Sequence, residues 1–211
     1  MTKGEPMGQT TIPVVLTDRL VMRAPQQSDF EAYARFFADP QSEPIGGPVP
    51  KDVAWRKLAT VAGHWMLRGY GMWALEEKST GDFAGLCGPW FPDGWTEPEI
   101  GWSLMLGKTG KGYATEAALA ARDFAYSVLG WHTAISLIAP DNHASKRVAE
   151  RLGAHFEEIR TIPYHGGSLT AEIFRHPGPK TLARRAETDQ AQKNASKEAR
   201  ADQLEDSNSH P

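Results

Sequence analysis

Apolar and polar positions follow two different spacings along residues 11–177. At Arg19–Arg23 the apolar residues Leu20 and Met22 alternate with polar neighbours, which predicts a first strand. Further strand-like segments lie at residues 71–77, 83–89, 99–106, 133–139, 156–163 and 169–175. The chain is therefore expected to form about seven strands.

Other segments carry apolar residues three or four positions apart, which predicts helices with one buried face. These helices are expected at about residues 28–39, 51–67, 113–129 and 143–152. Ser28 is expected to cap the first helix, which ends before Pro40. The order of elements predicts an α+β or mixed α/β fold with a largely antiparallel front half.

Both ends of the chain differ from this central part. Residues 1–10 are polar and are expected to be loose. From residue 181 to 211 the only large apolar residues are Leu182 and Leu204, so this segment cannot bury enough apolar area to offset its loss of entropy. We expect one domain at 11–177 and a polar, disordered tail at 178–211, in which an Ala-rich stretch is helical only transiently.

Composition narrows the classes of function. The chain has 211 residues, 40% of them hydrophobic, and a formal net charge of -3, which argues against nucleic acid as the main partner. No stretch approaches the roughly 18 apolar residues that span a bilayer. The N-terminus lacks the hydrophobic core of a signal peptide, and a single cysteine suits a reducing compartment. We expect a cytoplasmic protein that has no membrane partner.

The sequence gives little support for a metal site or for a nucleophilic cysteine. The seven histidines show no HxxxH spacing and no acidic cluster beside them, so no metal site is expected. Cys87 lies in an apolar strand with no His or Asp at a suggestive spacing. We interpret it as a buried structural thiol rather than a nucleophile.

The most informative segment is Glu99–Ala120, where a strand leads into Gly107, Gly110 and Gly112 and a helix begins directly afterwards. Glycines permit a tight turn and the close approach of a ligand, while free N–H groups and the helix dipole attract phosphate. Lys108 and Lys111 are expected to add positive charge. The alternative is an ordinary Gly-rich turn without a ligand.

Two familiar nucleotide motifs are absent from this turn. A P-loop ending at Gly107-Lys108-Thr109 would need glycine at position 102, which is Trp102. A dinucleotide fingerprint starting at Gly110 would need Gly or Ala at position 115, which is Thr115.

Thr109–Ala114 instead resembles the coenzyme A motif of the GNAT acetyltransferase superfamily, Gln/Arg-x-x-Gly-x-Gly/Ala, which it matches at Gly112 and Ala114. Thr109 stands where the family has Gln or Arg, but the backbone contacts do not depend on that side chain. Further similarities occur in the same order at residues 16–23, 69–74, 99–102, 141–145 and 152–154. Together they resemble the branch that contains the ribosomal-protein N-terminal (Rim-type) acetyltransferases.

The resemblance implies a central, mostly antiparallel sheet with one splayed parallel pair and about four flanking helices. It also implies acetyl-coenzyme A (acetyl-CoA) as co-substrate. The pantetheine arm would pair with the backbone of Leu104, Met105 and Leu106. The pyrophosphate would lie over Thr109, Gly110, Lys111, Gly112, Tyr113 and Ala114. A backbone N–H beside the splay would polarise the thioester carbonyl, an effect worth about 3–4 kcal/mol of barrier.

Asn142 and Ser145 are three residues apart at the start of a predicted helix. From the residues alone, Asn142 is a helix cap worth about 1 kcal/mol. The resemblance adds a bond from Asn142 to the pantetheine arm and places Ser145 near the thiol. The family's general-acid tyrosine is replaced by Ala149, so Ser145 is expected to assist departure of the thiolate.

Direct transfer needs a base, because a neutral amine must attack. Glu99 opens the strand that borders the acceptor cleft and is the candidate base, the alternative being a solvated carboxylate at a strand end. Glu116 is interpreted as structural, since a negative charge suits the first turn of a helix. Trp90 and Trp95 are expected to border the cleft, whereas Trp102 is expected to pack in the core.

The resulting hypothesis is acetyl transfer to a primary amine, either a protein N-terminus or a small molecule. A non-catalytic module of the same fold that binds acyl-CoA or a partner protein is the alternative. A nucleotide-dependent kinase is a third class, disfavoured by the broken P-loop spacing. The sequence specifies neither the acceptor nor the oligomeric state.

Overall fold

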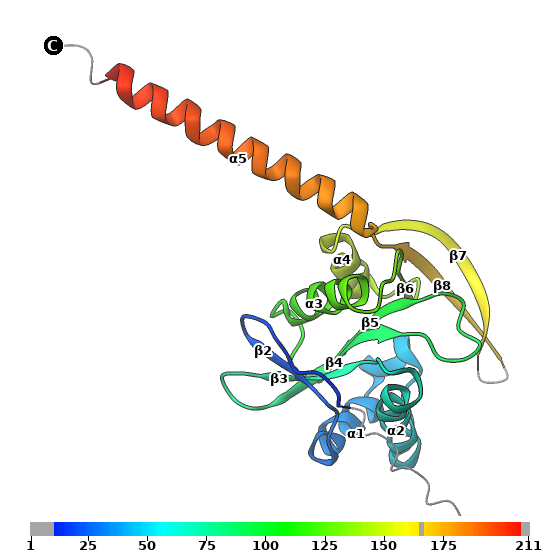
Figure 1. Ribbon diagram of the computed structural model, residues 1–211. Coiled ribbons are helices and arrows are strands. Elements are labelled where there is room, and N and C mark those ends of the chain that lie inside the picture. The colour runs from blue at the N-terminus through cyan, green and yellow to red at the C-terminus, as the bar shows by residue number, and fades with distance from the viewer. Residues whose placement is uncertain (1–10, 165–166, 208–211) are drawn as a thin grey trace, which may run out of the picture. The chain divides into compact units, whose positions relative to one another are not determined.

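The computed structural model describes residues 11–164 and 167–207 (Figure 1). The chain forms two compact units, Met1–His176 and Pro177–Pro211, which are described separately. The first unit is built on one eight-stranded sheet with the order β1-β2-β3-β4-β5-β6-β8-β7. Its strands are β1 Val15–Leu16, β2 Leu20–Arg23, β3 Trp73–Glu77, β4 Phe83–Trp90, β5 Glu99–Leu104, β6 Ile135–Ile138, β7 His155–Tyr164 and β8 Gly167–Arg175.

Neighbouring strands pair antiparallel throughout the sheet, except for the parallel pair β5–β6. This confirms the expected mostly antiparallel sheet with one parallel pair. The strand missing from the sequence-based prediction is β1, which is only two residues long and pairs with β2. A two-residue strand is too short to show an alternating pattern.

The described residues of the first unit form four α-helices: α1 Phe30–Ala38, α2 Lys51–Arg68, α3 Tyr113–Ser127 and α4 His143–Arg151. Two 3₁₀ segments, η1 Gln27–Asp29 and η2 Pro40–Ile45, flank α1. The prediction that Ser28 caps the first helix is wrong, because Ser28 lies inside η1. Asp29 instead ends η1 with its carboxylate bound to the N–H of Gln26 at 2.8 Å and to the Arg23 guanidinium at 2.8 and 2.9 Å.

The helices cover the two faces of the sheet, with α3 on one side and α1 and α2 on the other (Figure 1). Strand alternation divides the core in the same way: Trp73 and Leu75 pack with the α3 face, while Ala74 of the same strand packs with α1 and α2. The α3 face carries small residues, which let the helix lie close to the sheet. These residues are Ala117, Ala118, Ala121 and Ala125, all fully buried.

The described part of the second unit contains one helix, α5 Pro179–Ser207, where the sequence suggested a disordered tail with transient helicity. The difference has a local cause, since Ala, Glu, Lys, Arg and Gln are strong helix formers. Residues 183–194 are all exposed, as expected for a helix without an apolar stripe. Among the described residues, no helix is both long and apolar enough to cross a membrane.

Candidate active site

The parallel strands β5 and β6 separate immediately after their first contact. They pair at Glu99 and Ile135, and a regular parallel ladder would next join the Leu137 N–H to the Ile100 carbonyl. In this structure the Leu137 N–H instead lies 3.3 Å from Glu99 Oε1, and the Ile100 carbonyl accepts a 2.7 Å bond from Ser136 Oγ. Two side chains thus occupy the place of ladder bonds, which accounts for the splay.

The splay decides which backbone groups of Leu104, Met105 and Leu106 face the gap between β5 and β6, where the pantetheine contacts were predicted. The Met105 N–H donates to the Ala84 carbonyl, and the Met105 carbonyl accepts from the Lys108 N–H, both at 3.0 Å. Since successive residues of a strand direct their backbone groups to opposite sides, Trp102 and Leu104 direct theirs away from β4, toward the gap. Leu106 follows the strand in the turn. The Met105 N–H is therefore already engaged by β4, whereas the backbone groups of Leu104 face the gap.

Glu99 sits at the opening of the splay with only 8% of its surface exposed, so it is not a solvated carboxylate at a strand end. Its Oε2 accepts a 2.7 Å bond from the Trp95 indole N–H. Burial raises the pKa of Glu99 to about 7, although the bonds from Trp95 and Leu137 act in the opposite direction. A carboxyl group with this pKa exchanges protons readily at neutral pH.

Glu99 lines a cavity of about 1190 Å³ on the α1–α2 side of the splay. The cavity wall is mostly aromatic and aliphatic, a composition typical of sites for organic ligands. Its lining includes Tyr33, Phe37, Val61, Met72, Trp90 and Trp95. The expectation that Trp90 and Trp95 border this space agrees with the structure. Trp102 lines the cavity as well as packing against the core.

The turn between β5 and α3 has the geometry that its glycines suggest. Gly107, Gly110 and Gly112 all have positive φ, between 74° and 83°. Gly112 is the N-cap of α3, and no described side chain caps it. In the first turn of α3, the buried Thr115 Oγ1 also lacks a hydrogen-bond partner among the described residues. Uncapped amides beside an unsatisfied hydroxyl fit a diphosphate bound at this helix start.

The two lysines of this turn behave differently. Lys108 Nζ contacts Glu77 Oε2 and Asp82 Oδ2, each at 2.8 Å, so its charge is already paired. Hydrogen bonds from Lys108 and from the Tyr113 hydroxyl lower the pKa of Glu77 to about 2, which keeps this carboxylate ionised. The expectation that Lys108 adds free positive charge is therefore wrong. Lys111 is exposed beside the Tyr113 ring.

Arg19 brings another cation to the turn, which spacing along the sequence does not reveal and which, like Lys108, is paired with a carboxylate. Its guanidinium lies 2.7 Å from Glu116 and donates a 2.7 Å bond to the Lys111 carbonyl. Glu116 also accepts from Thr17 Oγ1 at 2.6 Å and from the Arg19 N–H at 2.7 Å. The structural interpretation of Glu116 agrees with these contacts, which tie the N-terminal segment to α3.

The start of α4 is capped as expected, because Asn142 Oδ1 accepts the Ser145 N–H at 3.0 Å. The Ser145 hydroxyl accepts a 3.3 Å bond from the Trp102 indole N–H, which links α4 to β5. Ala149 is fully buried in a cluster with Ile138 and Phe174. The position matched to the family's tyrosine is thus part of the core.

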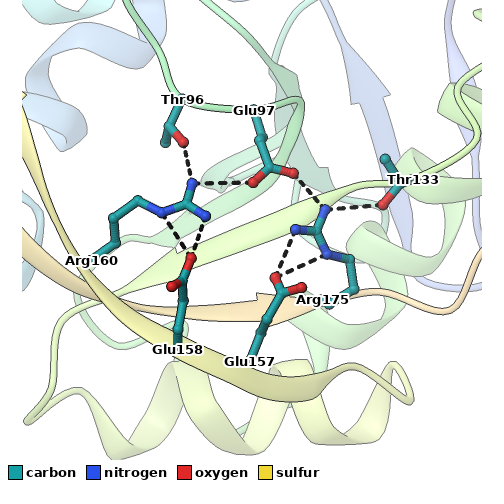
Figure 2. A network of polar contacts seen from close by, with 7 residues as sticks. All are labelled: Thr96, Glu97, Thr133, Glu157, Glu158, Arg160 and Arg175. Carbon is teal, nitrogen blue, oxygen red and sulfur yellow. Dashed lines mark hydrogen bonds and ion pairs between the residues drawn. The ribbon is translucent and has the colours of Figure 1, made fainter.

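A polar network fixes the segment that precedes Glu99 (Figure 2). The Glu97 carboxylate is held by Arg175 Nη1 at 2.6 Å and by Arg160 Nη1 at 3.1 Å. Arg160 also donates to Thr96 Oγ1 at 2.5 Å. The outer sides of the two guanidinium groups contact Glu157 and Glu158. These contacts, called here the Glu97 network, connect β7 and β8 to the chain that carries Trp95 and Glu99.

Cys87 is fully buried, and this burial raises the pKa of its thiol, as expected of a structural residue. Within the described residues, no group of three His, Cys, Asp or Glu side chains could hold a metal ion.

Comparison with known proteins assigns the chain to a family. Residues 19–155 match the family described as "Acetyltransferase (GNAT) domain", which is well over half of the chain. The chain belongs to this family. This confirms the family that the resemblance implied.

Individual proteins resemble the chain to different extents. The acetyltransferase from Agrobacterium tumefaciens is 33% identical, with a TM-score of 0.71 over 79% of this chain and 95% of that one. YkkB of Bacillus subtilis is 40% identical over 95 residues, which are 43% of this chain and 55% of YkkB, about half of that relative's length. RimJ of Mycobacterium smegmatis, solved in complex with CoA-disulfide, is 18% identical, with a TM-score of 0.60 over 77% of this chain and 83% of that one. At that identity the similarity shows the fold alone.

Proposed function

We propose that this GNAT protein transfers the acetyl group of acetyl-CoA directly to a primary amine, without a covalent enzyme intermediate. The observation that supports this most strongly is the buried Glu99 carboxyl, with a pKa of about 7, where β5 and β6 separate beside a large cavity. A base near neutral pH is what an amine acceptor requires, because most amines are protonated in water at pH 7.

In this proposal the backbone facing the gap, at Leu104 and its neighbours, would hold the pantetheine arm. The turn and the uncapped first residues of α3, Thr109 to Ala114, would hold the diphosphate, with Arg19 and Lys111 beside them. Acetyl-CoA would supply an activated thioester. The amine nitrogen would then form a bond to the acetyl carbon, and the carbon–sulfur bond would break.

Two side chains would act on the amine and on the leaving thiolate. Glu99 would accept the proton that the acceptor amine loses, directly or through water. Ser145, whose hydroxyl already contacts Trp102 of β5, would stabilise the departing thiolate by donating a hydrogen bond, and Asn142 would contact the pantetheine arm as well as capping α4. The products would be an amide and free coenzyme A.

The direct test measures thiol release from acetyl-CoA by the purified chain with a panel of amines, together with cofactor affinity by calorimetry. The proposal expects amine-dependent release. Tight cofactor binding with no release for any amine would favour the alternative, a non-catalytic module that binds acyl-CoA.

The Glu97 network is expected to affect this chemistry from outside the cavity. Glu97→Gln should weaken the hydrogen bonds of Arg160 and Arg175 to residue 97 and so loosen residues 96–97. Water should then reach Glu99, and better solvation of its carboxylate should lower the pKa of Glu99. We expect kcat to fall about tenfold and the ascending limb of the pH–rate profile to move to lower pH.

Glu158→Gln is the matched control, because Glu158 contacts Arg160 at the edge of the network and leaves the bonds of Glu97 in place. Its pH–rate profile should equal that of the wild type. An unchanged profile for Glu97→Gln would mean that the network only stabilises the fold.

A further inference from the structure

Lys57 of α2 is a cation in an unusual position. It lines the cavity that Glu99 also lines, and its side chain is half-buried. Its Nζ lies 5.2 Å from the centroid of the Phe37 ring, another part of the cavity wall. Burial lowers the pKa of this ammonium, with no opposing contribution from a carboxylate. No described carboxylate lies within ion-pair distance of it.

The other charged groups of the lining do not share this situation. Arg56 is exposed and paired with Asp52 at 2.9 Å. Glu43, Asp93 and Asp141 are exposed, so water and salt screen their charges. Among the described residues of the lining, Lys57 and Glu99 are thus the charged groups withdrawn from solvent.

A half-buried ammonium without a partner attracts an anion more strongly than an exposed lysine does, because water competes less. Resting on the proposed function, we infer that the acceptor is an amine that also bears a carboxylate on an aromatic or aliphatic body, as amino acids and short peptides do. Glu99 would receive the amine end and Lys57 the carboxylate, while Tyr33, Phe37 and Trp90 would contact the apolar part.

The inference also disfavours acceptors with several positive charges, since Lys57 would repel a second ammonium group. Polyamines and aminoglycosides are therefore expected to be poor substrates. The competing explanation is that Lys57 merely lays its aliphatic stem along the wall and directs its charge to solvent. In that case a carboxylate on the acceptor would bring no advantage.

The test uses pairs of amines that differ by one carboxylate: phenylalanine with phenylalaninamide, and a phenylalanyl dipeptide with its C-terminal amide. Because a carboxylate also changes the pKa of a nearby amine, kcat/KM is expressed per concentration of unprotonated amine. The two pairs place the anion at different distances from the amine. For the wild type we expect kcat/KM to favour the acid of at least one pair by about tenfold or more, the effect of one hydrogen bond between charged groups. Lys57→Met should reduce this ratio to about one, and Lys57→Arg should restore much of it.

Lys51→Met is the matched control on the same helix, because Lys51 is exposed and pairs with Glu31 on the surface. It should keep the wild-type ratio. Equal kcat/KM for acid and amide in the wild type, or a ratio that Lys57→Met leaves unchanged, would overturn the inference while leaving the proposed function intact.

Calorimetry of the same four compounds separates the two hypotheses if no compound is turned over. Tighter binding of the acids that Lys57→Met abolishes would support the contact between Lys57 and a carboxylate, while the lack of turnover would count against the proposed function. Equal binding of acids and amides would overturn the inference as well. Circular dichroism of each variant establishes that it is folded.

Discussion

Glu99→Gln is expected to lower kcat by about 10²- to 10³-fold while leaving the affinity for acetyl-CoA unchanged, because it removes the base but not the cofactor contacts. In the wild type, kcat should rise with pH through the Glu99 pKa of about 7 and then level off, since only the ionised carboxylate accepts a proton. The variant should lose this rise. Glu31→Gln on the surface of α1 is the control and should behave as the wild type.

Wild-type kinetics for Glu99→Gln would remove Glu99 from the mechanism. A second measurement checks the cause of its pKa. The folded state raises this pKa, so between about pH 4.5 and pH 7 the native chain binds a proton that the unfolded chain has released. The contribution of Glu99 to stability is therefore fully present below that window and is lost as the pH rises through it.

Urea unfolding of the wild type and of Glu99→Gln at pH 5 and at pH 8 measures this linkage. The Gln side chain has one oxygen and one NH₂ group, so its NH₂ would face either the Trp95 or the Leu137 N–H, and two donors would meet. This lowers the free energy of unfolding by an amount that does not change with pH. Relative to the wild type, Glu99→Gln should therefore gain stability between pH 5 and pH 8, whatever the difference at pH 5. A pH-independent difference would contradict the assigned pKa.

Gly112→Trp is expected to abolish measurable binding of acetyl-CoA. Gly112 has φ 83° at the start of α3, and a Cβ there would lie 3.2 Å from Arg19 Nη2, so a large side chain must extend over the amides proposed to bind the diphosphate. Calorimetry with acetyl-CoA measures the loss.

Gly130→Trp controls for backbone strain, since Gly130 also has a positive φ of 69° but lies in open space beyond the other end of α3. That helix has 15 residues and is about 22 Å long. Both variants should lose similar stability, but only Gly112→Trp should lose the cofactor. Normal affinity in Gly112→Trp would separate the turn from coenzyme A binding.

The features that were predictable from the sequence are those encoded locally. The strand, three glycines and helix around Gly112 are contiguous, so the pattern alone indicates their conformation. The Asn142 cap is equally local, because its partner Ser145 is three residues away. The mostly antiparallel sheet also follows from the order of elements and from the family resemblance.

Contacts between segments that are far apart in the sequence could not be predicted from it. Arg19 and Glu116 are 97 positions apart, and nothing in their spacing indicates that they meet. Lys108 looked like a free cation because its partners Glu77 and Asp82 belong to an earlier hairpin. The burial of Glu99 depends on the Trp95 ring, on Leu137 and on the separation of β6, which only the folded chain brings together.

The position of Cys87 has a practical consequence for every assay based on released coenzyme A. The usual colour reagents react with any accessible thiolate, and the one sulfhydryl of this chain is both sealed in the core and resistant to ionisation. The folded enzyme should thus give no background signal. Slow colour development in the absence of acetyl-CoA would instead report how often the folded molecules open.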